Sequence, residues 1–483
     1  MIDFYIADKY RGLVTIIVST DDNTRLEIDS SNGKTDDNKA AEVGKSPKRI
    51  LNLIRQKIPE GGFARNVLAL MSGSLIGQAI IAAASPVLTR LYTPAEIGNL
   101  ALYISVVTVG AVVLSWRYEL AIVLPEDDRD AANLFILSTA IAVGMTIISM
   151  VPILLFRSSI VGLLGNPDIG PWLVLVPLSF LALGMYQVFN SWCTRKKQFN
   201  SIAGSKIGQS SAVAGVQIST GLSAMGTAGL IAGQVAGAVI ASLYLFRKIA
   251  KEDFRFILNS FNLQRLKKTA AVYRKYPIYS TWPAFINIFS LSLPIFFMMH
   301  YYNTEFVGQY ALSMRVLQIP VFLIGASVGK VYFQRLAQEK NRTGDISGLV
   351  ENTFRKLLII AVPGSIVLML ISPFLFSLVF GETWRTAGEL TAILTPAMAI
   401  RFFTSPLSTA FGVSNRQEVA ARWQISQLIC TIVFLYSSLH FDNPVATIYA
   451  IMINDMLLYI VFLVLIFRIS GAKFSRALKF SHQ

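Results

Sequence analysis

Long apolar segments, one after another, are the feature that most constrains this chain. From Asn66 to Phe467, stretches of about 20 mostly apolar residues alternate with polar breaks, and about 20 such residues are what a helix needs to cross a bilayer. Charged residues make up only 15% of the chain, against roughly 25% in a soluble domain. We therefore expect an all-α, polytopic membrane protein. The twelve predicted spans are 66–88, 99–116, 134–156, 172–193, 201–222, 228–246, 277–300, 309–329, 357–379, 390–411, 423–440 and 445–467.

Lys and Arg residues between the predicted spans indicate the orientation. Of the 43 Lys and Arg residues, 37 lie in the two tails and in alternate loops, and only Arg90, Arg157 and Arg385 lie in the opposite loops. Cytoplasmic loops of membrane proteins carry such an excess of positive charge. The bias predicts that both termini are cytoplasmic. It also accounts for the net charge of +15 without a nucleic-acid partner.

Two segments at a constant offset of 210 predict an internal repeat. Tyr, Gly, Ala and Leu match between residues 92–102 and 302–312, and a second, weaker match joins 195–198 to 414–417 at an offset of 219. Six spans separate the equivalent segments. Because six is even, both halves enter the membrane from the same side, which is a known transporter arrangement. We expect two parallel six-helix lobes around a central cavity. The predicted domains are a cytoplasmic tail at 1–64, a lobe at 65–247, a basic cytoplasmic linker at 248–276, a second lobe at 277–468 and a cytoplasmic tail at 469–483.

The segment before the first span divides into two parts. Residues 19–50 contain no aromatic residue and are rich in Asp, Asn, Ser and Lys, a composition typical of disorder. Residues 47–59 place apolar side chains on one helical face with Lys and Arg around them. This pattern fits a basic amphipathic helix on an anionic leaflet. It fits equally well a solvent-exposed segment that precedes the first span.

Ionisable residues inside or at the ends of the predicted spans are the candidate functional groups. A charge at the bilayer centre costs about 2.5–3.5 kcal/mol on insertion scales, so it is retained where it is paired or faces water. The embedded charges are mostly cationic, which predicts an anionic substrate bound in a cavity. The cationic candidates are Arg401, Arg315, Lys206, Arg117, Lys330 and Arg422, and the acidic candidates for charge tuning or proton coupling are Asp455 and Glu119.

Structural roles compete with these assignments. Lys206, Lys330 and Arg422 are close enough to the inner face to extend their ammonium or guanidinium groups into water. Arg401 and Asp455 could form an ion pair that only stabilises the fold. No spacing of the three histidines or two cysteines matches a metal site or a disulfide framework, so we expect no metal, no cofactor and no catalytic residue.

Several motifs resemble those of bacterial polysaccharide (O-antigen-type) flippases of the multidrug/oligosaccharidyl-lipid/polysaccharide exporter superfamily. They are SGSLIGQ at 72–78, PVLTRLYTPAEIG at 86–98, WRYELAIVLP at 116–125, RVLQIP at 315–320 and RFFTSPL at 401–407. The resemblance covers roughly residues 64–470. Lys330 departs from the family pattern, in which an uncharged polar residue is common at that position.

This resemblance implies a two-lobe exporter that alternates between inward-open and outward-open forms. The implied substrate is an undecaprenyl-pyrophosphate-linked glycan, moved to the periplasmic leaflet for O-antigen, capsule or exopolysaccharide assembly. The implied role also suggests a polysaccharide polymerase and the chain-length machinery as partners.

Two other functional classes compete with this interpretation. One is a multidrug or small-molecule ion-coupled antiporter of the same superfamily, in which embedded acids would be expected to prevail if it exports cations. The other is a membrane enzyme, which would need a sizeable outer loop or a cytosolic sugar-nucleotide domain.

Overall fold

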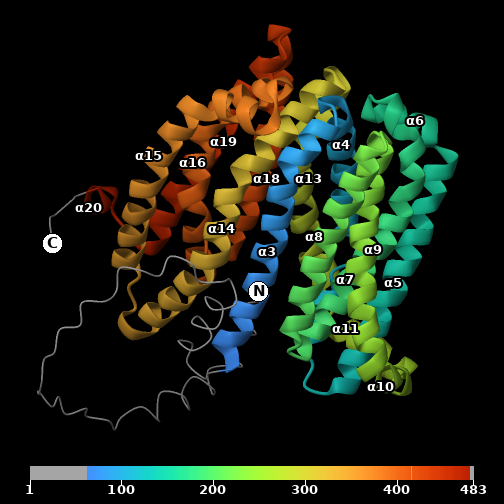
Figure 1. Ribbon diagram of the computed structural model, residues 1–483. Helices are drawn as coiled ribbons and strands as arrows, with labels where there is room; N and C mark the ends of the chain where they lie inside the picture. The colour runs from blue at the N-terminus through green and yellow to red at the C-terminus, as the bar shows by residue number, and fades with distance from the viewer. Residues whose placement is uncertain (1–61, 415, 479–483) are drawn as a thin grey trace, which may run out of the picture. The chain divides into compact units, whose positions relative to one another are not determined.

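The computed structural model describes residues 62–414 and 416–478, and within them every regular element is a helix. The amphipathic helix predicted at 47–59 lies outside the described residues. So do the side chains of 62–71, 322–328, 330, 331, 417, 420 and 421. Residues 69–483 form one compact unit, separate from the residues before them, and the following description concerns that unit (Figure 1).

Within the described residues, twelve long helices follow the order of the twelve predicted spans. They are α3 (Gly62–Leu91), α4 (Pro94–Ala111), α5 (Asp128–Leu155), α7 (Val176–Arg195), α8 (Phe199–Leu222), α9 (Thr227–Glu252), α13 (Thr281–Tyr301), α14 (Thr304–Thr343), α15 (Ser347–Phe380), α16 (Arg385–Leu407), α18 (Gln417–Ser438) and α19 (Pro444–Ser470). The short elements are η1 (Tyr118–Val123), α6 (Arg157–Leu164), η2 (Pro167–Leu175), α10 (Phe254–Asn259), α11 (Leu263–Val272), α12 (Lys275–Tyr279), η3 (Glu382–Trp384), α17 (Ala410–Val413), η4 (Leu439–Phe441) and α20 (Phe474–Ala477).

Ten helical segments of the described residues are long and apolar enough to cross a membrane, which confirms the all-α polytopic class. Helices α8 and α14, at the predicted spans 201–222 and 309–329, are not among these ten, so the count of twelve spans stays a prediction. Large apolar side chains are exposed on the outside of the bundle, such as Leu155, Leu370 and Phe374, which are 71%, 77% and 70% exposed. Such a surface fits lipid rather than water.

One predicted span has a different end. We expected the second span to run from 99 to 116, but α4 ends at Ala111. Trp116 and Arg117 adopt left-handed backbone angles, with φ of 48° and 61°, which a right-handed helix does not accommodate. Residues 112–115 are mostly apolar, so hydropathy alone continues the span across this turn.

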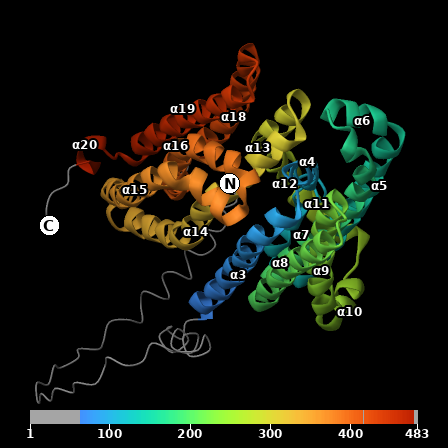
Figure 2. The same ribbon diagram turned by 45° about the horizontal axis from the view of Figure 1, so that its top comes forward.

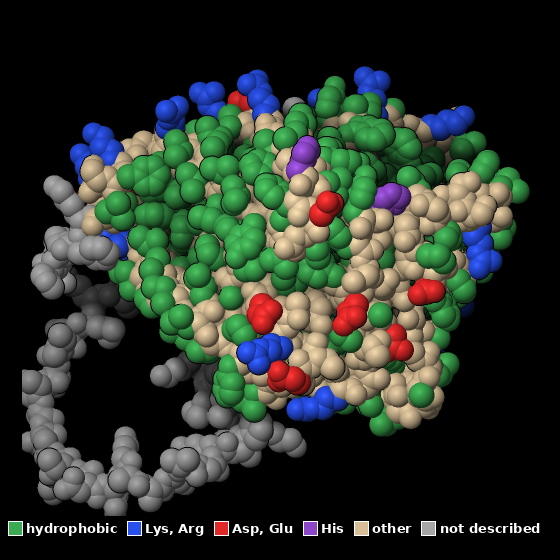
Figure 3. Space-filling view, turned by 90° about the horizontal axis from the view of Figure 1, so that it is seen from above, with side chains coloured by type: hydrophobic (Ala, Val, Ile, Leu, Met, Phe, Trp, Pro, Cys, Tyr) green, Lys and Arg blue, Asp and Glu red, His purple; other side chains and the backbone are tan. Residues whose placement is uncertain are grey.

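The starts of α4 and α14 are alike, as the predicted repeat requires. Thr93 caps α4 in a reciprocal pair with Glu96. At the equivalent position, 210 residues later, the Asn303 side chain accepts a hydrogen bond from the Phe306 amide at 2.7 Å and caps α14. Such caps satisfy amide groups that a helix leaves unpaired at its N-terminus. We name the end of the bundle where α4 and α14 begin the Gly98 end. Figure 3 views the molecule from there and shows basic and acidic side chains among polar and apolar ones.

Close contacts between helices depend on glycine. A Cβ atom placed on Gly229, Gly233 or Gly237 of α9 would meet Thr220, Gln217 or Val213 of α8. Gly73 of α3 likewise faces Ala203 of α8. The absence of side chains at these glycines therefore lets the backbones of α9 and α3 approach α8 closely.

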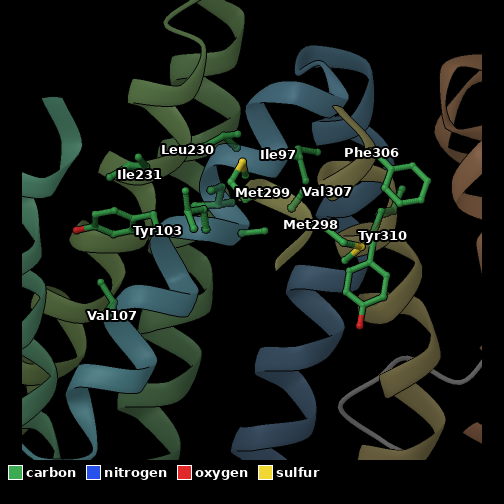
Figure 4. Close-up of a cluster of buried hydrophobic side chains, with 14 of the residues drawn as sticks. Ile97, Tyr103, Val107, Leu230, Ile231, Met298, Met299, Phe306, Val307 and Tyr310 are labelled. Carbon is green, nitrogen blue, oxygen red and sulfur yellow. The ribbon is translucent and has the colours of Figure 1, made fainter. Parts of the chain in front are cut away.

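Three apolar cores hold the helices together, and their positions differ. One core is shared by both halves and lies toward the Gly98 end; it includes Ile97 of α4, Met298 and Met299 of α13, and Phe306 and Val307 of α14 (Figure 4). The second core lies within the C-terminal half, among α14, α15, α16 and α19. The third lies within the N-terminal half, among η1, α5, α7, α9 and α10. Helices α4–α9 accordingly group apart from α14–α19 when the view is turned (Figure 2).

Candidate functional site

A cavity of about 350 Å³ lies between the two halves. Helices α3, α4, α8 and α9 supply most of its wall, and α14 supplies Arg315. We name it the Lys206–Arg315 cavity. Its lining is Ser74, Gly77, Gln78, Ile81, Leu100, Lys206, Gln209, Ser210, Val213, Gln217, Gln234 and Arg315.

Lys206 and Arg315 reach this cavity from opposite halves. Lys206 Nζ donates to Gln209 Oε1 at 3.3 Å and lies 4.8 Å from the centroid of the Tyr186 ring. Neither Lys206 nor Arg315 forms an ion pair within the described part of the chain, and Arg315 has no hydrogen bond to another described residue. Both side chains are half-buried. Two cations without a neighbouring carboxylate, facing a polar cavity at membrane depth, favour an anionic ligand.

Helix periodicity places the α8 side chains on one wall. Lys206, Gln209, Ser210, Val213 and Gln217 follow spacings of three and four residues, which put side chains on the same face of a helix. Gly77 of α3 faces the Ser210 hydroxyl so closely that a Cβ atom there would lie 2.9 Å from it. The absence of a side chain at this position lets α3 form the adjacent wall.

Arg401 and Asp455 line a different, much smaller cavity inside the C-terminal half. Its volume is about 30 Å³, and helices α13, α14, α16, α18 and α19 enclose it. The Arg401 guanidinium lies 5.6 Å from the centroid of the Tyr459 ring, and Asp455 Oδ1 accepts from Asn454 Nδ2 at 3.1 Å. Among the described residues no ion pair joins Arg401 to Asp455. This volume has room for one or two water molecules and excludes a lipid headgroup.

Three buried polar atoms near Asp455 have no protein partner among the described residues. They are Ser290 Oγ, Gln427 Oε1 and Asn454 Oδ1, and their residues all line the small cavity. A buried polar atom without a hydrogen bond costs about 1–3 kcal/mol. A small polar molecule such as water, bound in this cavity, would therefore stabilise the protein by forming hydrogen bonds with these atoms.

Arg117 and Glu119 lie together in the N-terminal half, beyond the end of α4. Glu119 is 2% exposed, and its carboxylate accepts a 2.5 Å hydrogen bond from Ser115 Oγ. Arg117 Nε is buried and has no partner among the described atoms. Neither residue lines either cavity.

Two further candidates lie elsewhere. Arg422 is exposed near the start of α18, and the Lys330 side chain lies outside the described residues. The structure thus brings Lys206 together with Arg315, Arg401 with Asp455, and Arg117 with Glu119. The roles of all eight residues remain predictions. Within residues 62–414 and 416–478, no cluster of three or more His, Cys, Asp or Glu side chains could hold a metal ion.

The four glutamines of the Lys206–Arg315 cavity are residues that the sequence analysis missed. Gln78, Gln209, Gln217 and Gln234 all lie within predicted spans, where polar side chains usually face protein or water. A search for embedded amides as well as embedded charges would have found them.

Comparison with known proteins decides the family. Residues 87–389, more than half of the chain, match the family model described as "Polysaccharide biosynthesis protein".

The chain belongs to that family.

Curated relatives agree with this membership and confirm the resemblance to polysaccharide flippases. The chain is 22% identical to the lipopolysaccharide biosynthesis protein WzxC of Escherichia coli (strain K12) over 291 residues, 59% of this chain and 56% of that relative. It is 24% identical to the teichuronic acid biosynthesis protein TuaB of Bacillus subtilis (strain 168) over 34% of this chain and 35% of that one. The chain thus spans about half and a third of the length of these relatives.

Solved transporter structures share the fold. The structure titled "Lipid II flippase MurJ, inward closed conformation" matches with a TM-score of 0.65 at 12% identity, over 86% of this chain and 89% of that one. An inward-facing multidrug resistance MATE family transporter of the MOP superfamily matches with a TM-score of 0.55 at 14% identity, over 84% and 94%. At these identities the similarity concerns the fold alone.

Proposed function

We propose that this protein is a flippase that moves an undecaprenyl-pyrophosphate-linked oligosaccharide from the cytoplasmic to the periplasmic leaflet. The observation that carries the proposal is the Lys206–Arg315 cavity, where two cations from opposite halves face a polar space at membrane depth. A pyrophosphate cannot cross hydrocarbon unaided, because burying an unpaired charge costs tens of kcal/mol by the Born estimate. Charge-assisted hydrogen bonds from Arg and Lys would replace its hydration.

The distribution of the cores supports access from the cytoplasm. The halves share an apolar core toward the Gly98 end and have separate cores at the other end. The Lys and Arg bias predicts that this other end faces the cytoplasm. In this orientation the cavity receives substrate from the leaflet where lipid-linked units are made, and the lipid tail stays in the bilayer.

The membrane potential would assist the movement. Two negative charges moving outward across an inside-negative membrane gain about 4.6 kcal/mol per 100 mV. Asp455 beside Arg401, and Glu119 beside Arg117, would tune the charge of the two halves or carry coupling protons. A water molecule in the small cavity at Asp455 would give such a proton an acceptor.

Substitution of the cavity cations tests the proposal. In a deletion strain of the source organism, Arg315→Gln should not restore surface polysaccharide, although the protein is made at the normal level. Lys251→Gln, at an exposed position at the end of α9, is the matched control and should restore it. Lipid-linked single units should accumulate on the cytoplasmic side in the deletion strain. Full restoration by Arg315→Gln would reject the assignment of the site.

The other function classes predict different outcomes. A small-molecule antiporter is supported by the fold shared with the MATE transporter, and it predicts altered drug sensitivity with normal surface polysaccharide in the deletion strain. A polymerase predicts accumulation of lipid-linked units on the periplasmic side. We propose a transporter and not an enzyme.

A further inference from the structure

Amide side chains of the Lys206–Arg315 cavity have hydrogen-bonding capacity that the fold does not use. Gln78 of α3 and Gln234 of α9 line the cavity, and neither has a side-chain hydrogen bond to another described residue. Gln217 differs, because its Nε2 donates to the Leu230 carbonyl at 2.9 Å and so holds α8 against α9. Gln209 accepts from Lys206 through its carbonyl, so Gln78 and Gln234 are the two amides that have both their donor and their acceptor available to a ligand.

The depth of each side chain follows from its position along its helix. At 1.5 Å per residue, Lys206 lies about 24 Å, Arg315 about 16 Å and Gln234 about 10 Å from the ends of their helices nearest the Gly98 end. Gln78 is close to the level of Ser210, because its neighbour Gly77 faces Ser210. From the Lys206 side toward the Gly98 end, a ligand thus meets Lys206, then Gln78 and Arg315, and finally Gln234.

This order suits a lipid-linked glycan that enters sugar first. With the lipid tail in the leaflet on the Lys206 side, a pyrophosphate would lie between Lys206 and Arg315, and the attached sugar would lie beyond it. A carboxamide offers two N–H donors and a carbonyl acceptor, which complement hydroxyl and acetamido groups. The cavity volume of about 350 Å³ is at the small end of the range of ligand sites, so it accommodates the part of the glycan nearest the phosphates.

We propose that Gln78 and Gln234 form a glycan subsite that binds the sugar attached to the pyrophosphate; this inference rests on the proposed function. Lys206 and Arg315 bind the phosphates, and the two amides distinguish a glycan-bearing carrier lipid from a sugar-free one. A site built to hydrogen-bond a polar substrate discriminates against the analogue that lacks those groups, because its own polar groups are then left unpaired.

Binding to two lipids separates the subsite from the phosphate site. The full-length protein, in nanodiscs, is titrated with sugar-free undecaprenyl pyrophosphate and with the lipid-linked oligosaccharide extracted from the deletion strain. The double variant Gln78→Met/Gln234→Met keeps side-chain length and removes the hydrogen bonds. We expect it to bind the glycan-bearing lipid about tenfold more weakly than the wild type and the sugar-free lipid equally well.

Two further variants complete the experiment. Arg315→Gln should weaken binding of both lipids. Gln318→Met, at an exposed position of α14 outside the cavity lining, should change neither. Equal losses for both lipids in the Gln78→Met/Gln234→Met variant, or no loss for the glycan-bearing lipid, would overturn the glycan subsite alone. If the wild type binds neither lipid, the proposed function itself fails.

Discussion

Gly98 of α4 and Gly308 of α14 lie face to face, one from each half of the protein. A Cβ atom on Gly98 would collide with the Thr304 carbonyl oxygen, and a Cβ atom on Gly308 would collide with the Pro94 carbonyl oxygen. Each glycine also lies against the amide nitrogen of the other. These are the two glycines that match at the offset of 210, so the internal repeat is brought together at its own equivalent positions.

Substitution of either glycine should separate α4 from α14. We expect Gly98→Ala to lower the free energy of unfolding by about 1–3 kcal/mol, because a methyl group forced into a packed contact shifts the backbone. The melting temperature of the purified protein measures this. Gly144→Ala, in α5, is the matched control, since a Cβ atom there meets nothing within 4 Å. Equal melting temperatures for the two variants would show that the Gly98–Gly308 contact is not tight.

A disulfide between the halves should trap the conformation described here. Asn166 Nδ2 lies 3.3 Å from Met299 Sδ, and a Cβ atom on the neighbouring Gly165 would meet the backbone of His300. We expect Asn166→Cys/Met299→Cys, with Cys193 and Cys430 replaced by Ser, to form a bond under oxidation and to stop surface polysaccharide assembly until a reductant is added. The single variants are the controls. Continued assembly by fully cross-linked protein would mean that the halves need not separate at the Gly98 end.

Loss of the Trp384 indole N–H should weaken the same end. Trp384 is fully buried, and its Nε1 donates to the Thr89 carbonyl across the two halves at 2.9 Å. Trp384→Phe leaves that carbonyl unpaired, and we expect it to lower the free energy of unfolding by about 1–3 kcal/mol. It should also speed hydrogen exchange of amides at the end of α3. Phe380→Leu, which alters the same apolar core without a hydrogen bond, should leave that exchange unchanged.

Arg195 should be more important to stability than its neighbour Lys196. Its guanidinium donates to Asp128 and to the carbonyls of Ile122 and Pro125, and its side chain is 10% exposed. We expect Arg195→Met to lower the free energy of unfolding by about 2–4 kcal/mol, because it leaves buried hydrogen-bond acceptors unpaired.

Lys196→Met is the comparison, since Lys196 meets the same half-exposed Asp128 carboxylate at 2.8 Å. Exposed ion pairs contribute at most about 1 kcal/mol. A larger loss of stability in Lys196→Met than in Arg195→Met, measured by denaturant unfolding in detergent, would contradict this ranking.

The docking of the linker helix α11 should depend on the charge of Asp127. The Arg129 amide and the Arg265 guanidinium both donate to the Asp127 carboxylate at 2.8 Å, and these bonds lower its pKa. A lowered pKa means that the contribution to stability is present above the unfolded pKa of about 3.9 and is lost as the pH falls through the folded value. Trypsin should therefore cleave the linker near Lys267 equally slowly at pH 6 and pH 8.

Asp127→Asn removes this charge at neutral pH, and we expect faster cleavage of the linker in that variant. High salt should reduce the difference from wild type, because the contact is exposed and screened. Asp345→Asn, whose carboxylate bonds only within its own turn, is the control. Faster cleavage in this control as well would point to general destabilisation.

Hydropathy and the internal offset were enough to predict much of this fold. Each predicted span has a long helix at its place, because the bilayer requires length and apolar composition that the sequence displays directly. The end of α4 at Ala111 was missed, because residues 112–115 are mostly apolar and hydropathy continues as far as the turn at Trp116 and Arg117.

The candidate site was predicted less completely. Lys206 and Arg315 do share a cavity, but Arg401 and Asp455 line another. The spacing of these residues in the sequence does not specify that α14 lies between the two cavities. Arg315 and Met314 are neighbours in sequence and line different cavities. Which cavity each of two adjacent residues faces depends on the rotation of the helix about its axis. Tertiary packing sets this rotation.

The shared core toward the Gly98 end also affects how the protein should respond to temperature. If the halves part there during each cycle, apolar side chains such as Ile97 and Val307 become hydrated, and hydration of apolar surface raises the heat capacity. The activation enthalpy of the cycle would then change with temperature, so that a plot of log rate against reciprocal temperature is curved even where the protein remains fully folded.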